Sequence, residues 1–176
     1  MAPAAQKSAR KSPAKKASRA KPYTPETYVG HDGIGALITR CKTFIWEGGD
    51  RALAAHNITL SQWIVLKTLY HGEELTPATL CAEIGYDTGA MTRMLDRLEK
   101  SGFIRRVRRP EDRRSVRLEL TPTGRAIYPK LLKAIVGELN AVLEDFTIAE
   151  VRLMEALLGR LLTNARARAA QGRGEG

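Results

Sequence analysis

Hydrophobic residues recur at steps of three and four along several stretches of the chain, and this spacing predicts amphipathic helices. The first stretch runs from Gly33 to Ala55, and its apolar positions share one helical face: Ile34, Leu37, Ile38, Cys41, Phe44 and Ile45. A second, shorter helix is predicted over LSQWIVLKTLY. Thr59 is placed to cap its start, and the helix is expected to end around His71 and Gly72.

The segment ELTPATLCAEIGYDTGAMTRMLDRLEKSGFI predicts two helices joined by a tight turn. Thr76 is placed to cap the first helix, and Gly85 is placed to end it. The second helix begins at Asp87 or Thr88 and ends at Gly102. Its predicted buried face consists of Met91, Met94, Leu95 and Leu98. Two short helices in this order predict a helix-turn-helix.

The opposite face of the second helix is polar in its N-terminal half. We predict that it contacts nucleic acid through Thr88, Gly89, Thr92, Arg93 and Arg97. Small residues let a helix approach the floor of a DNA groove, while hydroxyls and guanidinium groups bind phosphates and base edges. This face is therefore the predicted recognition surface.

A two-stranded hairpin is predicted directly after this helix. A strand runs from Phe103 and Ile104 to Arg108, and RPEDRR is predicted to turn. The return strand is half-buried, with alternating apolar residues at Val116, Leu118 and Leu120. A helix-turn-helix followed by such a hairpin predicts a winged helix. Arg108, Arg113 and Arg114 are the predicted DNA contacts of the wing, because arginine is attracted to a narrow minor groove.

The charge of the chain is concentrated in two places. The net charge of the 176 residues is +10; residues 1–22 carry +7, residues 23–92 carry −4, residues 93–117 carry +6 and residues 118–176 carry +1. Two basic segments on a nearly neutral body are typical of nucleic-acid binding. A hydrophobic content of 43% is sufficient for a packed core.

These patterns divide the chain into five parts. Residues 1–22 are predicted to be a disordered basic tail, which either contacts phosphate non-specifically or only keeps the protein in solution. An N-terminal helical region covers 23–58, the winged helix-turn-helix covers 59–121, further helices cover 122–170, and 171–176 form a second tail. The predicted fold class is mainly α with a minor β part.

Several classes of protein are not supported by the sequence. It has no run of about 18 apolar residues and no signal-peptide pattern, so we expect a soluble, cytoplasmic protein without membrane contact. Cys41 and Cys81 lack the spacing of a metal site or disulfide framework, and both thiols are expected to be buried and reduced. His31, His56 and His71 have no catalytic neighbours, so no enzyme, metal or cofactor is predicted.

The segment LTPATLCAEIGYDTGAMTRMLDRLEKSGFIRRVRRPEDRRSVRLELTPTG resembles the central region of the multiple-antibiotic-resistance regulator (MarR) family of bacterial transcription factors. MTRMLDRLEKSGFI is similar to the family's recognition helix and its exit. The wing pattern of the family is matched by Asp112, Arg114, Leu118, Leu120 and Thr121. The resemblance extends from about Gly33 to Ala165, and the basic tail departs from it.

The resemblance implies a nucleoid-associated homodimer in which each subunit reads one half-site of a pseudo-palindromic operator in double-stranded DNA. The half-sites would lie about one helical turn apart, roughly 34 Å. Two apolar stripes near the C-terminus predict helices that pack either into the core of the same chain or, as we expect here, against a partner. One comprises Leu131, Leu132, Ile135, Val136, Leu139, Val142, Leu143 and Phe146, and the other Val151, Met154, Leu157, Leu158, Leu161 and Leu162.

Many members of that family are repressors that small anionic aromatic compounds release from DNA. The resemblance places Thr43, Trp63 and Lys67 in the ligand pocket, with Arg40 as a second cation. The expected function is repression of a catabolic, efflux or stress operon, relieved by a small aromatic carboxylate. An alternative interpretation remains open, in which Trp63 is an ordinary core residue and Lys67 an ordinary surface residue. So do redox sensing through Cys41 and a non-specific architectural or RNA-binding role.

Overall fold

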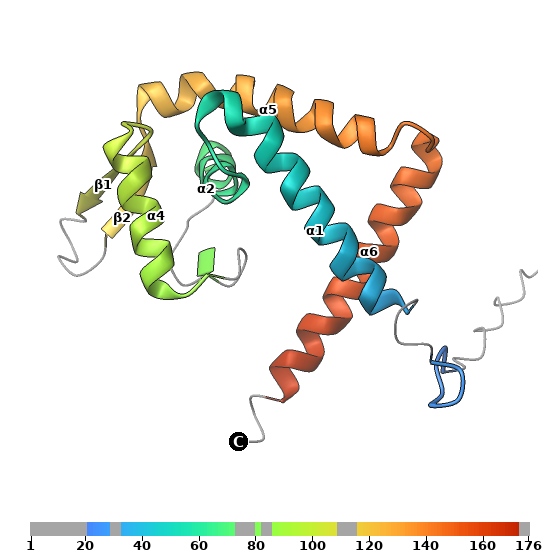
Figure 1. Ribbon diagram of the computed structural model, residues 1–176. Helices are drawn as coiled ribbons and strands as arrows, with labels where there is room; N and C mark the ends of the chain where they lie inside the picture. The colour runs from blue at the N-terminus through green and yellow to red at the C-terminus, as the bar shows by residue number, and fades with distance from the viewer. Residues whose placement is uncertain (1–20, 29–32, 73–79, 82–85, 109–115, 173–176) are drawn as a thin grey trace, which may run out of the picture. The chain divides into compact units, whose positions relative to one another are not determined.

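The computed structural model describes residues 21–28, 33–72, 80–81, 86–108 and 116–172 (Figure 1). Its elements are α1 (Ile34–Leu53), the 3-10 helix η1 (Ala54–His56), α2 (Leu60–Tyr70), α4 (Thr88–Lys100), β1 (Ile104–Arg108), β2 (Val116–Leu120), α5 (Pro122–Val142) and α6 (Ile148–Gln171). Helices dominate and β1 pairs with β2, which confirms the predicted fold class. The described residues fall into two units, one ending at Arg40 and one beginning at Cys41.

Helix α2 begins and ends where the sequence predicts. The Thr59 hydroxyl accepts a hydrogen bond from the backbone N–H of Gln62 at 3.3 Å, and the Gln62 side chain accepts one from the N–H of Thr59 at 2.9 Å. This reciprocal pair satisfies two backbone donors that a helix start leaves without partners. His71 is the C-cap, and Gly72 follows at φ 76°, a left-handed conformation that glycine adopts without a Cβ clash.

Helix α4 confirms the predicted second helix of the helix-turn-helix. Asp87 is its N-cap, and its carboxylate accepts the N–H of Ala90 at 2.8 Å. Gly102 follows the helix at φ 72°. The predicted apolar face is buried in full, at Met91, Met94, Leu95 and Leu98. This burial fixes which face of α4 remains exposed.

The first helix of the pair lies mostly outside the described residues, including its predicted cap and its predicted stop. Leu80 and Cys81 are helical, and the side chain of Leu80 is fully buried. The N–H of Tyr86 donates to the Cys81 carbonyl at 3.1 Å, and the Tyr86 hydroxyl lies 3.0 Å from the hydroxyl of Ser61. The residues just before α4 are therefore tied to α2.

Strands β1 and β2 form the predicted antiparallel hairpin. Ile104 lies opposite Leu120, and Arg106 lies opposite Leu118. Directly opposite residues point to the same side, so these four side chains share one face of the hairpin. Ile104 and Leu118 are buried on that face. The predicted RPEDRR turn lies outside the described residues.

One hydrophobic core connects α2, α4, the hairpin and the first half of α5. Helix α2 lies against α5 and β2, α4 lies against β1, and α5 lies against β2 (Figure 1). The buried apolar residues of this core are Leu53, Ile58, Leu60, Val65, Leu66, Leu69, Leu80, Met91, Met94, Leu95, Leu98, Ile104, Leu118, Leu131 and Ile135. The core holds α4 and the hairpin in one frame.

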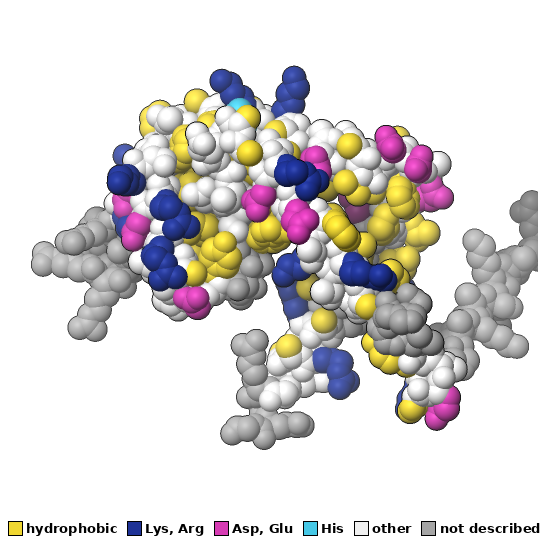
Figure 2. Space-filling model, in the orientation of Figure 1, with side chains coloured by type: hydrophobic (Ala, Val, Ile, Leu, Met, Phe, Trp, Pro, Cys, Tyr) yellow, Lys and Arg dark blue, Asp and Glu magenta, His cyan; other side chains and the backbone are white. Residues whose placement is uncertain are grey.

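The two apolar stripes near the C-terminus differ in burial. On α5, Leu131 and Ile135 belong to the core, whereas Leu132, Val136 and Leu139 are exposed. Helix α6 buries no residue completely: Val151 and Met154 are half-buried, and the other apolar positions of the stripe are exposed, at Leu157, Leu158, Leu161 and Leu162. Figure 2 shows hydrophobic side chains gathered where α5 passes into α6.

The expectation that both thiols are buried is wrong for Cys41, which is exposed on α1, and Cys81 is half-buried. The apolar periodicity of α1 correctly identified one helical face. That face also exposes Phe44, which is 68% accessible, and Ile45. Periodicity shows which side of a helix is apolar, but it does not show that the same chain covers that side.

Helix α5 starts in close contact with the hairpin. Thr121 caps it by accepting the N–H of Gly124 at 3.0 Å, and the N–H of Thr121 donates to the Phe103 carbonyl at 3.1 Å. A Cβ on Gly124 would collide with that same carbonyl oxygen and would lie 3.1 Å from Leu120 Cδ2. Only glycine permits this close approach.

We therefore expect Gly124→Ala to lower the free energy of unfolding by about 1–3 kcal/mol, because backbone must move to admit the methyl group. Gly137→Ala on the same helix is the control, since a Cβ there meets nothing within 4 Å. Alanine favours helix, so the control should be neutral or stabilising by up to about 1 kcal/mol. Urea unfolding measures both variants. Equal stability of the two would show that the Gly124 contact is unimportant.

Candidate nucleic-acid interface

The exposed face of α4 presents every residue predicted for recognition. Thr88, Gly89, Thr92, Arg93 and Arg97 are all exposed. They are exposed because the opposite side of the helix is committed to the core. The result is a polar surface that carries Arg93 and Arg97, with no acidic residue between Thr88 and Leu95.

The hydroxyl of Thr92 has a partner that sequence reasoning missed. It donates to the backbone carbonyl of Thr88 at 2.8 Å. Threonine and serine in helices often make this bond to the residue four positions earlier. The oxygen of Thr92 keeps its capacity to accept a hydrogen bond, so the side chain suits an amino group better than a phosphate.

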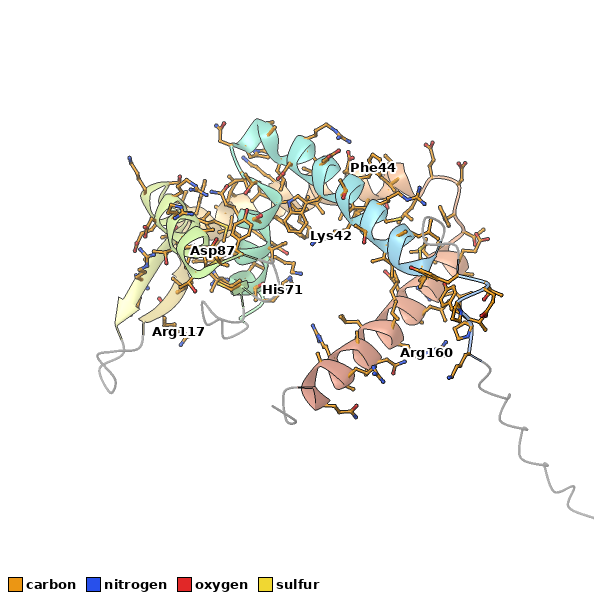
Figure 3. The ribbon with its side chains drawn as sticks, turned by 60° about the horizontal axis from the view of Figure 1, so that its bottom comes forward. Lys42, Phe44, His71, Asp87, Arg117 and Arg160 are labelled. Carbon is orange, nitrogen blue, oxygen red and sulfur yellow. The ribbon has the colours of Figure 1, made fainter. Side chains whose placement is uncertain are left out.

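Asp87, which Figure 3 labels, lies at the start of α4, where its carboxylate feels the charge of Arg93. The N–H of Ala90 lowers the pKa of the Asp87 carboxyl, and the positive charge of Arg93 contributes to the same shift. A Cβ on Gly89 would lie 3.2 Å from Asp87 Oδ1 and 3.3 Å from Arg93 Nη1. Gly89 thus leaves room for the guanidinium above the first turn of the helix.

Arg105 and Arg106 of the hairpin, which were not among the predicted DNA contacts, are paired within the protein. Arg105 Nη2 lies 2.7 Å from Glu119 Oε2 on the neighbouring strand. Arg106 Nη1 lies 2.7 Å from both Asp96 Oδ1 and Glu99 Oε2 on α4. Asp96 and Glu99 are three positions apart on one helix, and that spacing was the available signal.

The structure gives less information on the other arginines of the wing. Arg117 is exposed on β2, on the same face of the hairpin as Arg105 (Figure 3). Arg108 is the last residue of β1 and its side chain is not described. Arg113 and Arg114 lie outside the described residues.

A cluster of aromatic side chains joins α2 to α5, and sequence reasoning missed it. The rings of Tyr70 and Tyr128 stack with centroids 4.0 Å apart, and His71 Nε2 lies 3.2 Å from the Tyr128 hydroxyl. Arg125 lies over Tyr70 at 5.7 Å. Burial raises the pKa of Tyr128, and neighbouring Tyr70 adds to the shift. The cluster fixes the C-terminal end of α2, where Figure 3 labels His71.

Trp63 and Lys67 of the predicted pocket lie together on α2. Lys67 Nζ is 5.6 Å from the centre of the Trp63 ring. Trp63 is half-buried, and its indole N–H is buried with no hydrogen-bond partner among the described residues. An unsatisfied buried donor costs about 1–3 kcal/mol. Arg40 and Thr43 are exposed on α1.

Two further features of the described residues concern metal sites and membrane spans. In those ranges no three His, Cys, Asp or Glu side chains are grouped so that they could hold a metal ion. Within the same ranges, no helix has the length and apolar character needed to cross a membrane.

An exposed polar helix with a buried opposite face, followed by an antiparallel hairpin packed against it, defines a winged-helix DNA-binding protein. The MarR family model matches residues 58–116. The chain is 37% identical over 111 residues to the multiple antibiotic resistance protein MarR of Salmonella typhimurium, covering 62% of this chain and 77% of that relative. The protein belongs to the MarR family, and it is a DNA-binding transcription regulator rather than an enzyme.

Solved structures agree with this assignment. A mutant MarR from Escherichia coli complexed with operator DNA has a TM-score of 0.64 at 31% identity, covering 73% of this chain and 92% of that one. A MarR family protein of Mycobacterium tuberculosis in complex with salicylic acid also has a TM-score of 0.64, at 25% identity, and covers 73% of this chain and 96% of its own.

We expect Arg93→Ala to weaken binding to a specific duplex by about 1–3 kcal/mol, because the exposed guanidinium lies where a docked helix meets bases and phosphates. Lys130→Ala removes the same charge from an exposed position on α5 and should change binding little. The probe is the duplex that the full-length protein enriches from a random-sequence library, followed by fluorescence anisotropy. Equal losses in the two variants would mean that only net charge matters.

Proposed function

We propose that the protein is a homodimeric transcriptional repressor of a catabolic, efflux or stress operon. Each subunit would read one half-site of a pseudo-palindromic operator, and a small aromatic carboxylate would release the protein. The observation that carries the proposal is the exposed polar face of α4, held beside the hairpin by a shared core. Its location is the cytoplasm, at the nucleoid.

The exposed apolar side chains support a dimer. A single chain rarely leaves many large apolar residues in solvent unless a partner covers them. On α1, α5 and α6 the exposed large apolar residues are Ile34, Leu37, Ile38, Phe44, Ile45, Leu132, Val136, Leu139, Val142, Ile148, Leu153, Leu157, Leu158, Leu161 and Leu162. Helix α6 alone has 24 residues and buries none of them. A second copy of the chain is the partner that presents matching helices.

The interface supports recognition through both a helix and a wing. Helix α4 would enter the major groove with Thr88, Gly89, Thr92, Arg93 and Arg97. Arg108, Arg113 and Arg114 would meet the adjacent backbone and minor groove. The E. coli structure with operator DNA supports this class of target.

The pair of Trp63 and Lys67 supports an aromatic carboxylate as effector. The lysine supplies a positive charge, the indole supplies a flat surface, and its unpartnered N–H supplies a donor for an anionic oxygen. The salicylic acid complex of the M. tuberculosis relative supports the same chemical class. Thr43 and Arg40 would complete the pocket.

Cys41 is exposed in the single chain, and this exposure favours a second candidate, a thiol-based redox regulator, in which the dimer leaves the thiol open to oxidants. The two candidates differ in what releases DNA. Release by peroxide that Cys41→Ser abolishes would support redox sensing. Release by salicylate in that same variant would support the carboxylate.

The first test concerns specificity and the wing. A regulator should prefer its selected duplex over random DNA and RNA by at least about 10³ at fixed salt. Replacing Arg113 and Arg114 together with Ala should weaken binding and reduce the slope of log K against log salt by roughly one unit per lost phosphate contact. Similar affinity for all three nucleic acids would instead support an architectural or RNA-binding protein.

The second test concerns the effector, with salicylate as probe. A ligand that favours one of two spacings of the recognition helices couples to DNA binding by about 1–3 kcal/mol, so salicylate should weaken DNA binding roughly 5- to 150-fold. Lys67→Met should keep DNA affinity and lose this response. Lys42→Met is the control, because Lys42 lies over Trp46 at 5.8 Å in a similar pair on α1. A normal response in Lys67→Met would place the pocket elsewhere.

A further inference from the structure

Arg106 on β1 makes three hydrogen bonds to the carboxylates of two residues on α4. Arg106 Nη1 bonds to Asp96 Oδ1 and to Glu99 Oε2, each at 2.7 Å. The second oxygen of Glu99 accepts the backbone N–H of Arg106 at 2.9 Å. Glu99 therefore holds the backbone of the strand as well as its flexible side chain. The amide that it binds belongs to the free edge of the hairpin, where donors otherwise face solvent.

We propose that Arg106 is a positioning residue that fixes the angle between the wing and the recognition helix through Asp96 and Glu99. The inference rests on the proposed function, in which α4 and the hairpin touch DNA at the same time. A hairpin tip lies far from its base, so a small rotation at Arg106 moves the tip by a larger distance. Simultaneous contact with two grooves requires that this rotation be restricted.

The contacts of Arg106 with Asp96 and Glu99 have a second, electrostatic effect. Asp96 lies on the same side of α4 as Gly89 and Arg93, since these positions are three, four and seven residues apart. An unpaired carboxylate there would repel the phosphates of a bound duplex. The hydrogen bond that Arg106 donates to Asp96 raises the pKa of Arg106, with Glu99 adding to the shift, so the guanidinium remains charged beside both acids.

The rival role for Arg106 is direct contact with phosphate, and the two roles predict opposite signs. If Arg106 reached for DNA, the acids would compete with phosphate, and removing one would strengthen binding. If Arg106 positions the wing, removing an acid weakens binding even though it removes negative charge from a DNA-binding surface.

The experiment compares Glu99→Ala with Glu119→Ala in the full-length protein. Both variants remove one acid and one ion pair of 2.7 Å, but Glu119 pairs with Arg105 inside the hairpin and does not reach α4. The probe is the duplex selected from a random-sequence library. We expect Glu99→Ala to bind it about tenfold more weakly, and Glu119→Ala to bind it equally or more tightly.

The salt dependence separates positioning from general stability. Glu99→Ala should also lose about one unit of the slope of log K against log salt, because a displaced wing loses phosphate contacts although no wing arginine was changed. A variant that is merely less stable would keep the slope. Asp96→Ala should behave like Glu99→Ala. It replaces Glu99→Ala in the experiment if that variant unfolds at a low temperature, because the Asp96 side chain is 55% exposed and its removal should disturb the fold little.

Stronger binding by Glu99→Ala and Asp96→Ala, or an unchanged slope, would overturn the positioning role. Arg93→Ala is measured in parallel to distinguish this from a failure of the proposed function. If Arg93→Ala binds the selected duplex as tightly as the wild type, the assignment of α4 as recognition helix is wrong. If Arg93→Ala weakens binding while Glu99→Ala strengthens it, only the role of Arg106 is wrong.

Discussion

The burial of one face of α4 is the constraint on which the rest of the winged helix depends. Met91, Met94, Leu95 and Leu98 are almost completely inaccessible, so the helix cannot rotate about its axis without exposing them. That orientation keeps Arg93 in solvent and turns Glu99 toward β1. A recognition surface on a rigid helix loses little entropy on binding, because its side chains are already presented in one direction.

The arginines of the hairpin divide into two groups with different physical roles. Arg105 and Arg106 are held by carboxylates at 2.7 Å, so part of the positive charge in this segment is neutralised within the fold. Arg117 is exposed. The number of basic side chains in residues 93–117 therefore overstates the cations that a duplex would meet, whereas their net charge of +6 already includes Asp96 and Glu99. The ion pairs of Arg106 also tie β1 to α4.

The sequence predicted those features that have local causes. The Thr59 cap, the Asp87 start, the Gly102 stop and the buried face of α4 each arise from residues within a few positions of one another. The stacking of Tyr70 on Tyr128 joins segments that are far apart in the sequence, so no local pattern predicts it. The exposure of Cys41 was missed for another reason, since apolar spacing does not distinguish cover by the same chain from cover by a partner. Arg113 and Arg114 of the predicted wing tip lie outside the described residues.

Helix α2 is the element through which the proposed effector site and the DNA-binding surface would communicate. It carries Trp63 and Lys67, packs against both α5 and β2, and ends at Tyr70, whose ring is stacked on α5. A ligand that satisfied the Trp63 N–H would recover about 1–3 kcal/mol, which is comparable to the coupling that release from DNA requires. Close-packed helices transmit such a change as a displacement of whole elements, because their interiors do not compress. The hydrogen bond gained by the Trp63 N–H contributes to release only if the ligand can form it in the DNA-free arrangement of α2 and not in the operator-bound one. In that case its free energy is large enough for the proposed release.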